Sequence, residues 1–381
     1  MSAAVITHGC RSNLAERDAL AALAPAGATV VNSCAVTAEA VRDARAAVRA
    51  AAASGPVYVT GCAATLDPGR FADLAKIIPN ALKFQPETWG REGTPPAIST
   101  RQSRGFVAVQ DGCDHDCTFC VTRLARGPSR STPLADVVAR VSALAAHGVN
   151  EVVLTGIDTT SYGHDLAGKP TLGQLVHAIL AQVPVLPRLR LSSLDAAEAD
   201  EALLEAFTDR RLMPHIHLSL QSGDDLILKR MKRRHARADA IRLVERLKRA
   251  RPDIAIGADL IAGFPTEGEA AHRNSLALIA DCDLVHAHVF PFSPRPGTAA
   301  ARMPQVPPAT AKSRAASLRE SANERHKCFQ ERYLKSIVEV VSEGASGLTP
   351  HGLKLRFRQP YPRGALVEAS ARRIENGVLA E

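Results

Sequence analysis

The sequence lacks the long apolar segments that membrane insertion requires. No stretch of the 381 residues approaches the length of about 18 uninterrupted apolar positions at which a transmembrane helix is expected. The start of the chain has neither a basic region nor a long apolar region, so no secretory signal is evident. We therefore expect a cytoplasmic protein with no membrane partner.

A cytoplasmic location also excludes most disulfide bonds, which are rare in that compartment. The sequence nevertheless contains eight cysteines, and metal binding or catalysis is the usual explanation for such a number. Hydrophobic residues make up 46% of the chain and charged residues 23%, which excludes a disordered or fibrous protein. The length allows two or three domains, each with a hydrophobic core of its own.

The charge balance is basic, with 47 Lys and Arg against 39 Asp and Glu, a formal net charge of +8. Such a balance is compatible with an anionic partner such as a nucleic acid. Many ordinary enzymes of arginine-rich proteomes have the same balance, so the net charge by itself decides nothing.

The first 85 residues alternate short apolar strands with helices and form the first predicted domain. Strands are predicted at residues 5–7, 29–32 and 57–60, with helices at residues 14–23 and 38–53. Successive units of a strand and a helix indicate a parallel sheet.

Three cysteines of this domain, Cys10, Cys34 and Cys62, each come just after the end of a predicted strand. Right-handed crossovers bring the carboxyl ends of parallel strands to one edge of a sheet, which is where ligands bind. Buried structural cysteines are the alternative, since free cysteine packs as a small hydrophobic residue. Because the three occupy the same place in three successive units, we favour a set of metal ligands.

The rest of the chain is predicted to contain a linker, a second series of strand–helix units and a small β-domain. Residues 86–104 are rich in Pro, Gly and Ser and are predicted to be the linker. Six strands are predicted at residues 106–110, 151–155, 188–192, 215–220, 254–261 and 284–290. Helices are predicted at residues 134–146, 172–182, 236–249 and 267–280, and a long one at residues 309–334.

Six such units suggest a partial (β/α)6 barrel, open on one side, over residues 105–333. Short strands at residues 337–341, 352–357 and 365–368 indicate that residues 334–381 form a β-domain. The predicted fold class is therefore α/β, with an N-terminal parallel α/β domain, a central partial barrel and a small C-terminal β-domain.

The most distinctive motif follows the first predicted barrel strand, where Cys113, Cys117 and Cys120 have the spacing C-x3-C-x2-C. Three thiolates in one loop can bind three irons of a [4Fe–4S] cluster and leave the fourth iron open to a small ligand. Zinc is the alternative, with His115 as a fourth ligand. Structural zinc sites usually have two loops with C-x2-C pairs, however, and only one loop is present here.

Seven stretches spread over nearly the whole chain together resemble one enzyme family. They are residues 9–13, 31–37, 59–62, 109–120, 154–158, 217–223 and 293–298. The cysteine loop and its setting resemble the radical S-adenosylmethionine (SAM) enzymes, and the three upstream cysteines resemble those of the methylthiotransferase branch. Within that branch, residues 32–37 and 191–195 are most similar to the enzymes that act on N6-threonylcarbamoyladenosine-37 of tRNA.

The resemblance implies that the chain adds a methylthio group to C2 of N6-threonylcarbamoyladenosine at position 37 of tRNA. It implies two [4Fe–4S] clusters. The first, on Cys113, Cys117 and Cys120, binds and cleaves SAM, and the second, an auxiliary cluster on Cys10, Cys34 and Cys62, delivers sulfur. It further implies that a second SAM donates the methyl group and that a flavodoxin-like or ferredoxin-like protein donates electrons. Nothing in the sequence demands more than a monomer.

Three other functions remain open from the sequence. A methylthiotransferase of this branch could act on isopentenyladenosine-37 of tRNA or on a ribosomal protein. Outside the branch, a zinc-dependent RNA-binding protein without redox chemistry is the alternative.

Residues for SAM binding are predicted from their position at the ends of barrel strands. The predicted contacts are Gly156, Ser193, Gln221 and Gly263. At Gly156 the lack of a side chain would let the backbone approach the methionine moiety closely. For each of the four, a role in a turn or in packing at the top of the barrel is the alternative.

Two basic segments are predicted to contact RNA. The first is the dense cluster within residues 229–234, and the second is the strand at residues 353–358, where apolar and basic residues alternate. The predicted contacts are Lys229, Arg230, Arg233, Arg234, Lys354, Arg356 and Arg358. The C-terminal segment resembles the TRAM domain that these enzymes use for RNA. In both segments an ordinary solvated surface is the alternative.

Overall fold

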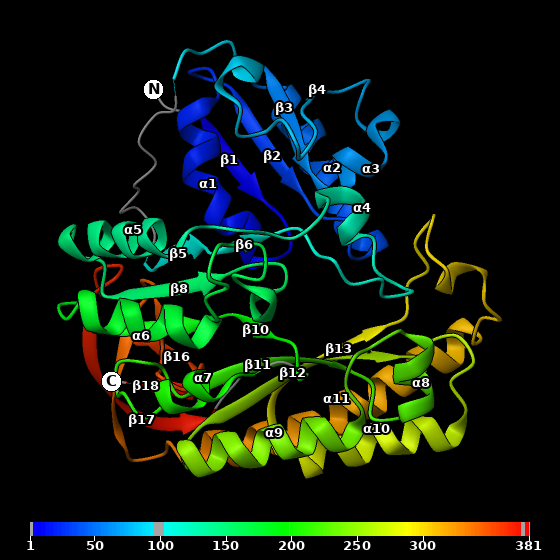
Figure 1. The fold of residues 1–381 in the computed structure, drawn as a ribbon, viewed down its shortest axis with the longest axis vertical. Coiled ribbons are helices and arrows are strands. Elements are labelled where there is room, and N and C mark those ends of the chain that lie inside the picture. The colour runs from blue at the N-terminus through cyan, green and yellow to red at the C-terminus, as the bar shows by residue number, and fades with distance from the viewer. Residues whose placement is uncertain (1–2, 94–102, 198, 375–377, 381) are drawn as a thin grey trace.

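The computed structural model describes residues 3–93, 103–197, 199–374 and 378–380. Figure 1 shows the N-terminal sheet stacked above the central barrel, with the C-terminal strands against one end of that barrel. The predicted three-part α/β architecture is thereby confirmed. None of the described helices is both long enough and apolar enough to cross a membrane.

The N-terminal domain contains a parallel sheet in the order β1-β2-β3-β4. Its strands are β1 (Ala4–Thr7), β2 (Thr29–Ser33), β3 (Val57–Gly61) and β4 (Lys76–Ile77), and its helices are α1 (Arg11–Leu23), α2 (Ala38–Ala52) and α3 (Cys62–Leu66). Thr37 explains where α2 begins, because its hydroxyl accepts a hydrogen bond of 3.1 Å from the amide of Ala40. The sequence predicted this sheet except for the two-residue strand β4.

The predicted linker begins with packed structure. A 3-10 helix spans Pro86–Trp89, and the buried indole of Trp89 donates a hydrogen bond of 2.9 Å to the carbonyl of Lys83. Its ring also lies 5.4 Å from that of Tyr58 in the sheet. Residues 94–102 of the predicted linker lie outside the described residues.

The central domain has six parallel strand positions, as predicted. One sheet contains β5 (Gly105–Ala108), β8 (Glu151–Thr155) and β9 (Arg188–Leu191), and the other contains β10 (Ser193–Leu194), β11 (His215–Gln221), β12 (Ala255–Ala262) and β13 (Leu284–Pro291). Only Ser192 separates β9 from β10, so the two sheets curve into one partial barrel with β5 and β13 as outer strands. A short antiparallel pair, β6 (Gln110–Asp111) and β7 (Arg130–Ser131), flanks the cysteine loop.

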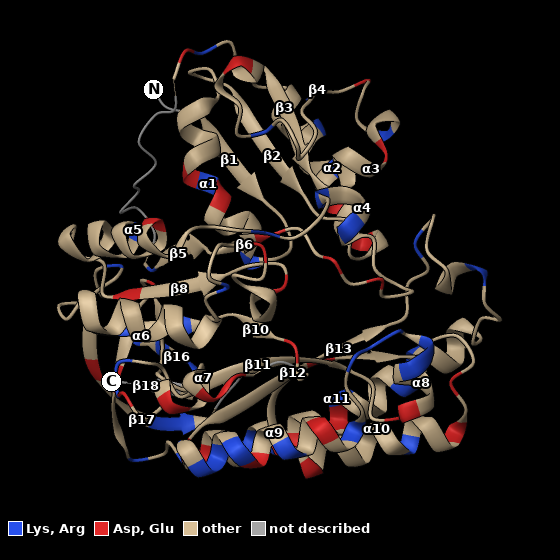
Figure 2. Cartoon of the chain, in the orientation of Figure 1, with Lys and Arg blue, Asp and Glu red and all other residues tan. Residues whose placement is uncertain are grey.

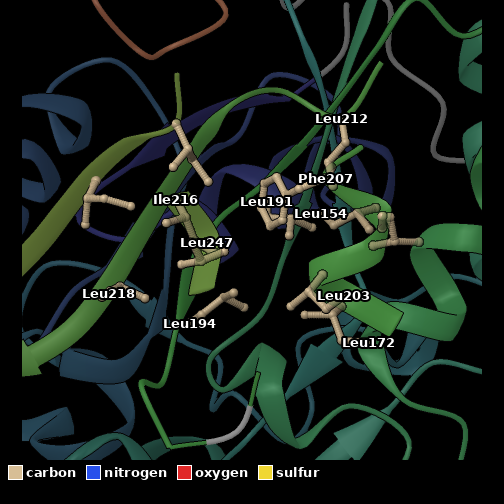
Figure 3. Close-up of a cluster of buried hydrophobic side chains, with 14 of the residues drawn as sticks. Leu154, Leu172, Leu191, Leu194, Leu203, Phe207, Leu212, Ile216, Leu218 and Leu247 are labelled. Carbon is tan, nitrogen blue, oxygen red and sulfur yellow. The ribbon is translucent and has the colours of Figure 1, made fainter. Parts of the chain in front are cut away.

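Helices cover the outer side of the strands. They are α5 (Leu134–Ala146), α6 (Leu172–Gln182), α7 (Glu201–Ala206), α8 (Asp225–Arg230), α9 (Arg237–Ala250), α10 (Glu269–Asp281) and α11 (Pro308–Glu331). The apolar side chains of the strands pack against these helices; Figure 3 shows Ile216 and Leu218 of β11 in one cluster with Leu247 of α9. The short helix α4 (Thr122–Arg126) follows the cysteine loop and lies against α3 of the N-terminal domain (Figure 1). The short helices α4, α7 and α8 were not predicted.

The inner face of the barrel is polar. Strand residues alternate between two faces, and the polar residues of several strands occupy the positions between the apolar ones. Ile216 and Leu218 belong to the outer core, so His215 and His217 between them face inward. The same alternation turns further polar side chains inward: Glu151 on β8, Arg188 and Arg190 on β9, Asp259 on β12, and His286 and His288 on β13.

The C-terminal domain is a small closed barrel in the order β14-β15-β16-β18-β17. Its strands are β14 (Ile337–Ser342), β15 (Ser346–Leu348), β16 (Lys354–Phe357), β17 (Leu366–Ile374) and β18 (Val378–Ala380). Strands β15 and β18 were not predicted. Since β18 pairs in parallel with β16 and antiparallel with β17, it closes the barrel.

This small barrel sits on the amino-terminal ends of the central strands. Arg188 donates a hydrogen bond of 2.6 Å to the carbonyl of Glu339, and Arg190 donates one of 2.9 Å to that of Pro350. Ala255 and Val285, at the starts of β12 and β13, share a hydrophobic core with the C-terminal domain. The opposite, carboxyl-terminal end of the central barrel remains free of this contact and carries the cysteine loop.

Candidate functional site

The loop that contains Cys113 is shaped by the glycine before it. Gly112 has a φ of +72°, and a Cβ atom there would lie 1.9 Å from the carbonyl oxygen of Pro128. Only glycine fits so close an approach. The Gln110 side chain donates a hydrogen bond of 2.8 Å to the carbonyl of Gly112, and the amide of Cys113 donates one of 3.1 Å to Gly127. The first cysteine is therefore held on a fixed backbone.

The structure brings Cys113, Cys117 and Cys120 together. Burial raises the pKa of the Cys113 thiol to about 12, and like charge on Cys120 and Cys117 acts in the same direction. Backbone amides point at two of the sulfurs, since His115 N lies 3.4 Å from Cys113 Sγ and Thr122 N lies 3.4 Å from Cys120 Sγ. Three sulfurs on one loop, two of them with amide donors, fit a [4Fe–4S] cluster with one open iron. Metal binding would displace the thiol protons.

The structure also brings Cys10, Cys34 and Cys62 together at the carboxyl edge of the N-terminal sheet. Cys10 directly precedes α1, Cys34 follows β2, and Cys62 begins α3. Burial raises the pKa of Cys34 to about 11, with Cys10 and Cys62 adding to the effect through like charge. A Cβ atom on Gly9 would lie 2.4 Å from Cys34 Sγ, so Gly9 allows this close packing. These three sulfurs fit a second metal cluster by the same donor chemistry.

Arg126 on α4 connects the two cysteine groups. Its guanidinium lies 2.8 Å from Glu16 on α1, 2.7 Å from Asp111 before the cysteine loop, and 2.7 Å from the Asn13 side chain. Although burial acts to lower it, the charges of Glu16 and Cys62 raise the pKa of Arg126 well above its ordinary value. A buried ion-pair network of this kind holds its elements in one arrangement, because breaking it would leave uncompensated charge.

A second arginine supports the cysteine loop from the barrel side. Arg233 donates hydrogen bonds of 2.8 Å to Asp195 and 2.7 Å to the carbonyl of Ser219, and its other terminal nitrogen lies 3.6 Å from Cys117 Sγ. The side chain is only 7% exposed. Arg233 was predicted as an RNA contact, and in the structure it faces inward instead. The reason is that the buried carboxylate of Asp195 requires a counter-charge.

His115, the ligand of the zinc alternative, lies within the loop and contacts other partners. Its Nε2 is 2.5 Å from Asp158 and 2.6 Å from Arg234. The ligand atoms of Cys113, His115 and Asp158 all lie within 4.8 Å of one another, so geometry alone would permit a metal ion there. Although burial acts to raise it, hydrogen bonds from His115 and Ser161 lower the pKa of Asp158.

The predicted SAM contacts lie at the carboxyl-terminal end of the barrel, as their strand positions required. Ser193 begins β10 and is exposed, whereas Gln221 ends β11 with a φ of +67°. Close packing explains why glycine occupies positions 156 and 263. A Cβ atom on Gly263 would lie 2.3 Å from Ala311 on α11, and one on Gly156 would lie 2.9 Å from Thr159. The role of the four in SAM binding stays a prediction.

The predicted alternation of the C-terminal basic strand is confirmed. Lys354, Arg356 and Arg358 are exposed, and the apolar residues between them are buried. Lys354 lies 3.5 Å from Glu343, a solvent-exposed contact that contributes little to stability. Along α9, in contrast, Figure 2 shows acidic and basic residues interspersed, which is typical of a solvated helix face.

Two other residues of the first basic segment contact polar side chains of the protein itself. Arg230 donates a hydrogen bond of 2.6 Å to the hydroxyl of Thr266, and Lys232 pairs with Asp116 at 2.5 Å. Lys229 is exposed. With Arg233 buried, this segment presents less basic surface than its sequence indicated, and its contact with RNA stays a prediction.

Sequence reasoning missed a polar group on the inner face of the barrel. His217 Nε2 lies 3.0 Å from Asp259 Oδ1, and His288 Nδ1 lies 3.2 Å from the same oxygen. The two imidazole rings are 4.7 Å apart. The signal was present, because residues 215–218 and 286–289 place a histidine at every second position of strands that are otherwise apolar.

The chain is similar to known proteins over most of its length. The Radical SAM superfamily model matches residues 107–279. The threonylcarbamoyladenosine tRNA methylthiotransferase MtaB of Rickettsia prowazekii is 40% identical over 405 residues, covering 98% of this chain and 96% of the relative. The protein of the same name from Thermotoga maritima is 33% identical over 377 residues, covering 88% and 85%.

A solved structure shows the same fold at low sequence identity. The radical S-adenosylmethionine methyltransferase TsrM from Kitasatospora setae matches with a TM-score of 0.56 and 16% identity, covering 73% of this chain and 64% of that chain. At that identity the likeness concerns the fold alone.

Proposed function

The chain belongs to the radical SAM methylthiotransferase family, and from this we propose that it adds a methylthio group to C2 of N6-threonylcarbamoyladenosine at position 37 of tRNA. Two relatives matched over most of their length carry the name of that activity. The observation that carries the proposal is the pair of cysteine groups, one on the loop after the first barrel strand and one at the sheet edge, joined through Arg126.

The family implies a [4Fe–4S] cluster and SAM. The sulfurs of Cys113, Cys117 and Cys120 would hold the cluster, whose fourth iron would be open to SAM. We further propose that Cys10, Cys34 and Cys62 hold a second cluster. The bound cofactors supply the radical and sulfur chemistry, which no side chain can perform. The protein supplies binding and orientation, and Arg126 and Arg233 do this by fixing the elements on which the two cysteine groups lie.

The observations weigh differently on the alternative functions left open by the sequence. Membership of the radical SAM family excludes a zinc-dependent RNA-binding protein without redox chemistry. The exposed basic strand at residues 354–358 supports an RNA substrate over a ribosomal protein. We also propose that a flavodoxin-like or ferredoxin-like protein donates electrons and that the enzyme acts as a monomer.

The proposed substrate is tested by mass spectrometry of tRNA nucleosides from a strain that lacks the gene. We expect 2-methylthio-N6-threonylcarbamoyladenosine to disappear and N6-threonylcarbamoyladenosine to accumulate, since its C2 would no longer be modified. Expression of the wild-type protein from a plasmid should restore the modified nucleoside. If that nucleoside persists in the deletion strain while a methylthio isopentenyladenosine is lost, the isopentenyladenosine alternative is correct instead.

The basic strand β16 is tested by RNA-binding measurements. Replacing Lys354, Arg356 and Arg358 together by glutamine should weaken tRNA binding by about 10- to 100-fold at low salt. The slope of log affinity against log salt concentration should fall by about two, because fewer counterions are released. Fluorescence anisotropy at several salt concentrations measures both quantities.

A matched control removes the same charge elsewhere. The triple replacement of Arg42, Arg49 and Arg140, which are exposed on α2 and α5, should leave the salt slope nearly unchanged. Equal effects of the two triple variants would mean that the basic strand has no specific part in binding.

A further inference from the structure

Arg11 is a partly buried cation without an ion pair at the junction of the N-terminal domain and the barrel. It is the first residue of α1 and follows Cys10 directly. Within the described part of the chain, its guanidinium takes part in none of the hydrogen bonds or ion pairs. Burial, together with the charges of the neighbouring Arg104 and Arg190, lowers the pKa of Arg11 to about 10. Such a group gains much from an anionic partner.

The acidic groups around Arg11 are already engaged by others. Arg190 binds Glu151 at 2.7 Å, and Arg104 binds Glu343 at 2.9 Å. Asp259 is shared by the two inner histidines His217 and His288. Glu151 and Asp259 attract Arg11 without forming an ion pair with it, and each has a closer cationic or imidazole partner. An anion from outside the chain could therefore become the direct partner of Arg11.

The position of Arg11 is open to a ligand. Its electrostatic neighbours Glu151, Arg190 and Asp259 lie on the inner face of the barrel, and α1 packs beside the outer strand β5. Next to them, the side chain of His288 is 62% exposed and that of Asp259 is 27% exposed. Solvent therefore reaches this part of the inner face.

The proposed substrate brings an anion to this place. In N6-threonylcarbamoyladenosine, the threonyl group carries a carboxylate on N6, and N6 and C2 lie on the two sides of N1 along one edge of the purine. If C2 faces the cysteine group that contains Cys10, the carboxylate lies within reach of the next residue. Arginine binds carboxylates through two parallel hydrogen bonds, a geometry that lysine cannot reproduce.

We propose that Arg11 binds the threonyl carboxylate and so selects this nucleoside over adenosines with an uncharged group on N6. The inference rests on the proposed function and adds the residue that recognises the substrate. Arg11 acts here through binding and takes no part in the chemical step. The preference for the charged group should be about 30-fold, the size expected of a charge-assisted contact with two hydrogen bonds.

The test compares two anticodon stem-loop RNAs that differ only in the threonyl group, one with the free carboxylate and one with its methyl ester. Binding to the cluster-loaded enzyme is measured by fluorescence anisotropy, and methylthio product by mass spectrometry. Wild type should bind the free acid about 30-fold more tightly than the ester. Arg11→Gln should bind both equally, at the affinity of wild type for the ester, and Arg11→Lys should keep part of the preference.

Two controls separate recognition from damage to the protein. Arg17→Gln, exposed on the same helix, should keep the full preference. Iron content and SAM cleavage without RNA are measured as well, because Arg11 is adjacent to the proposed cluster ligand Cys10 and its replacement could act through the cluster. If Arg11 acts on the RNA alone, Arg11→Gln should match wild type in both measurements.

The outcomes distinguish this inference from the proposed function. A wild-type enzyme that binds acid and ester equally, or an Arg11→Gln variant that keeps the preference, would overturn the role of Arg11 even if methylthio product forms. If the acid is preferred through Arg11 but wild type forms no methylthio product, carboxylate recognition stands and the proposed function fails.

Discussion

Replacing Cys113 by serine is expected to abolish both SAM cleavage and methylthiolation. A serine oxygen is a much poorer iron ligand than a thiolate, so only two of the three loop ligands would remain. The fold should tolerate the change, because the amide of Cys113 keeps its hydrogen bond to Gly127. Release of 5′-deoxyadenosine from SAM, measured by chromatography under reducing anaerobic conditions, should fall below detection.

Cys328 offers a matched control for this substitution. It is exposed on α11 and belongs to neither cysteine group, so Cys328→Ser should retain full activity and iron content. SAM cleavage by Cys113→Ser at a rate near that of wild type would show that the loop does not hold the cluster that binds SAM.

Replacing Cys34 by serine is expected to separate the two halves of the reaction. SAM cleavage should continue, because the cysteine loop and the contacts of Arg126 and Arg233 that support it are unchanged. Methylthio product should disappear, because the proposed second cluster would lose a ligand. The measurement is 5′-deoxyadenosine and nucleoside product from the same reaction mixture.

Iron content gives an independent reading of the same variant. It should fall from about eight to about four atoms per chain if each cysteine group holds one [4Fe–4S] cluster. A Cys34→Ser protein that still made methylthio product would show that this cysteine group does not supply the sulfur.

Much of the fold follows from local patterns, because each predicted strand is a short apolar run bounded by turn residues. The convergence of Cys10, Cys34 and Cys62 followed from their common place after parallel strands. The strands β15 and β18 did not follow, since they have three residues each and form only by pairing within the closed barrel. The domain boundaries at residues 85, 104 and 333 stay predictions.

The basic segment at residues 229–234 shows why part of the site escaped sequence reasoning. Its arginines look alike in the sequence, yet Arg233 is buried and Arg234 is exposed. Arg233 is buried because it pairs with Asp195, which lies far away in the sequence. Folding buries the Asp195 carboxylate, and only then does it need the charge of Arg233 beside it. Spacing along the chain cannot reveal such a pair. In the sequence, Arg11 likewise belongs only to the conspicuous stretch at residues 9–13. Its neighbours on the barrel strands come from the fold and could not be predicted from that stretch.

The contact between the C-terminal domain and the central barrel makes the stability of the barrel depend on this domain. Arg188 and Arg190 are almost fully buried and depend on backbone carbonyls of the C-terminal domain for their hydrogen bonds. Removing that domain would take away these carbonyl partners and leave Glu151 as the acidic group that faces both arginines at the base of the barrel. The domain therefore completes the buried polar network at the base of the barrel, in addition to presenting a basic surface.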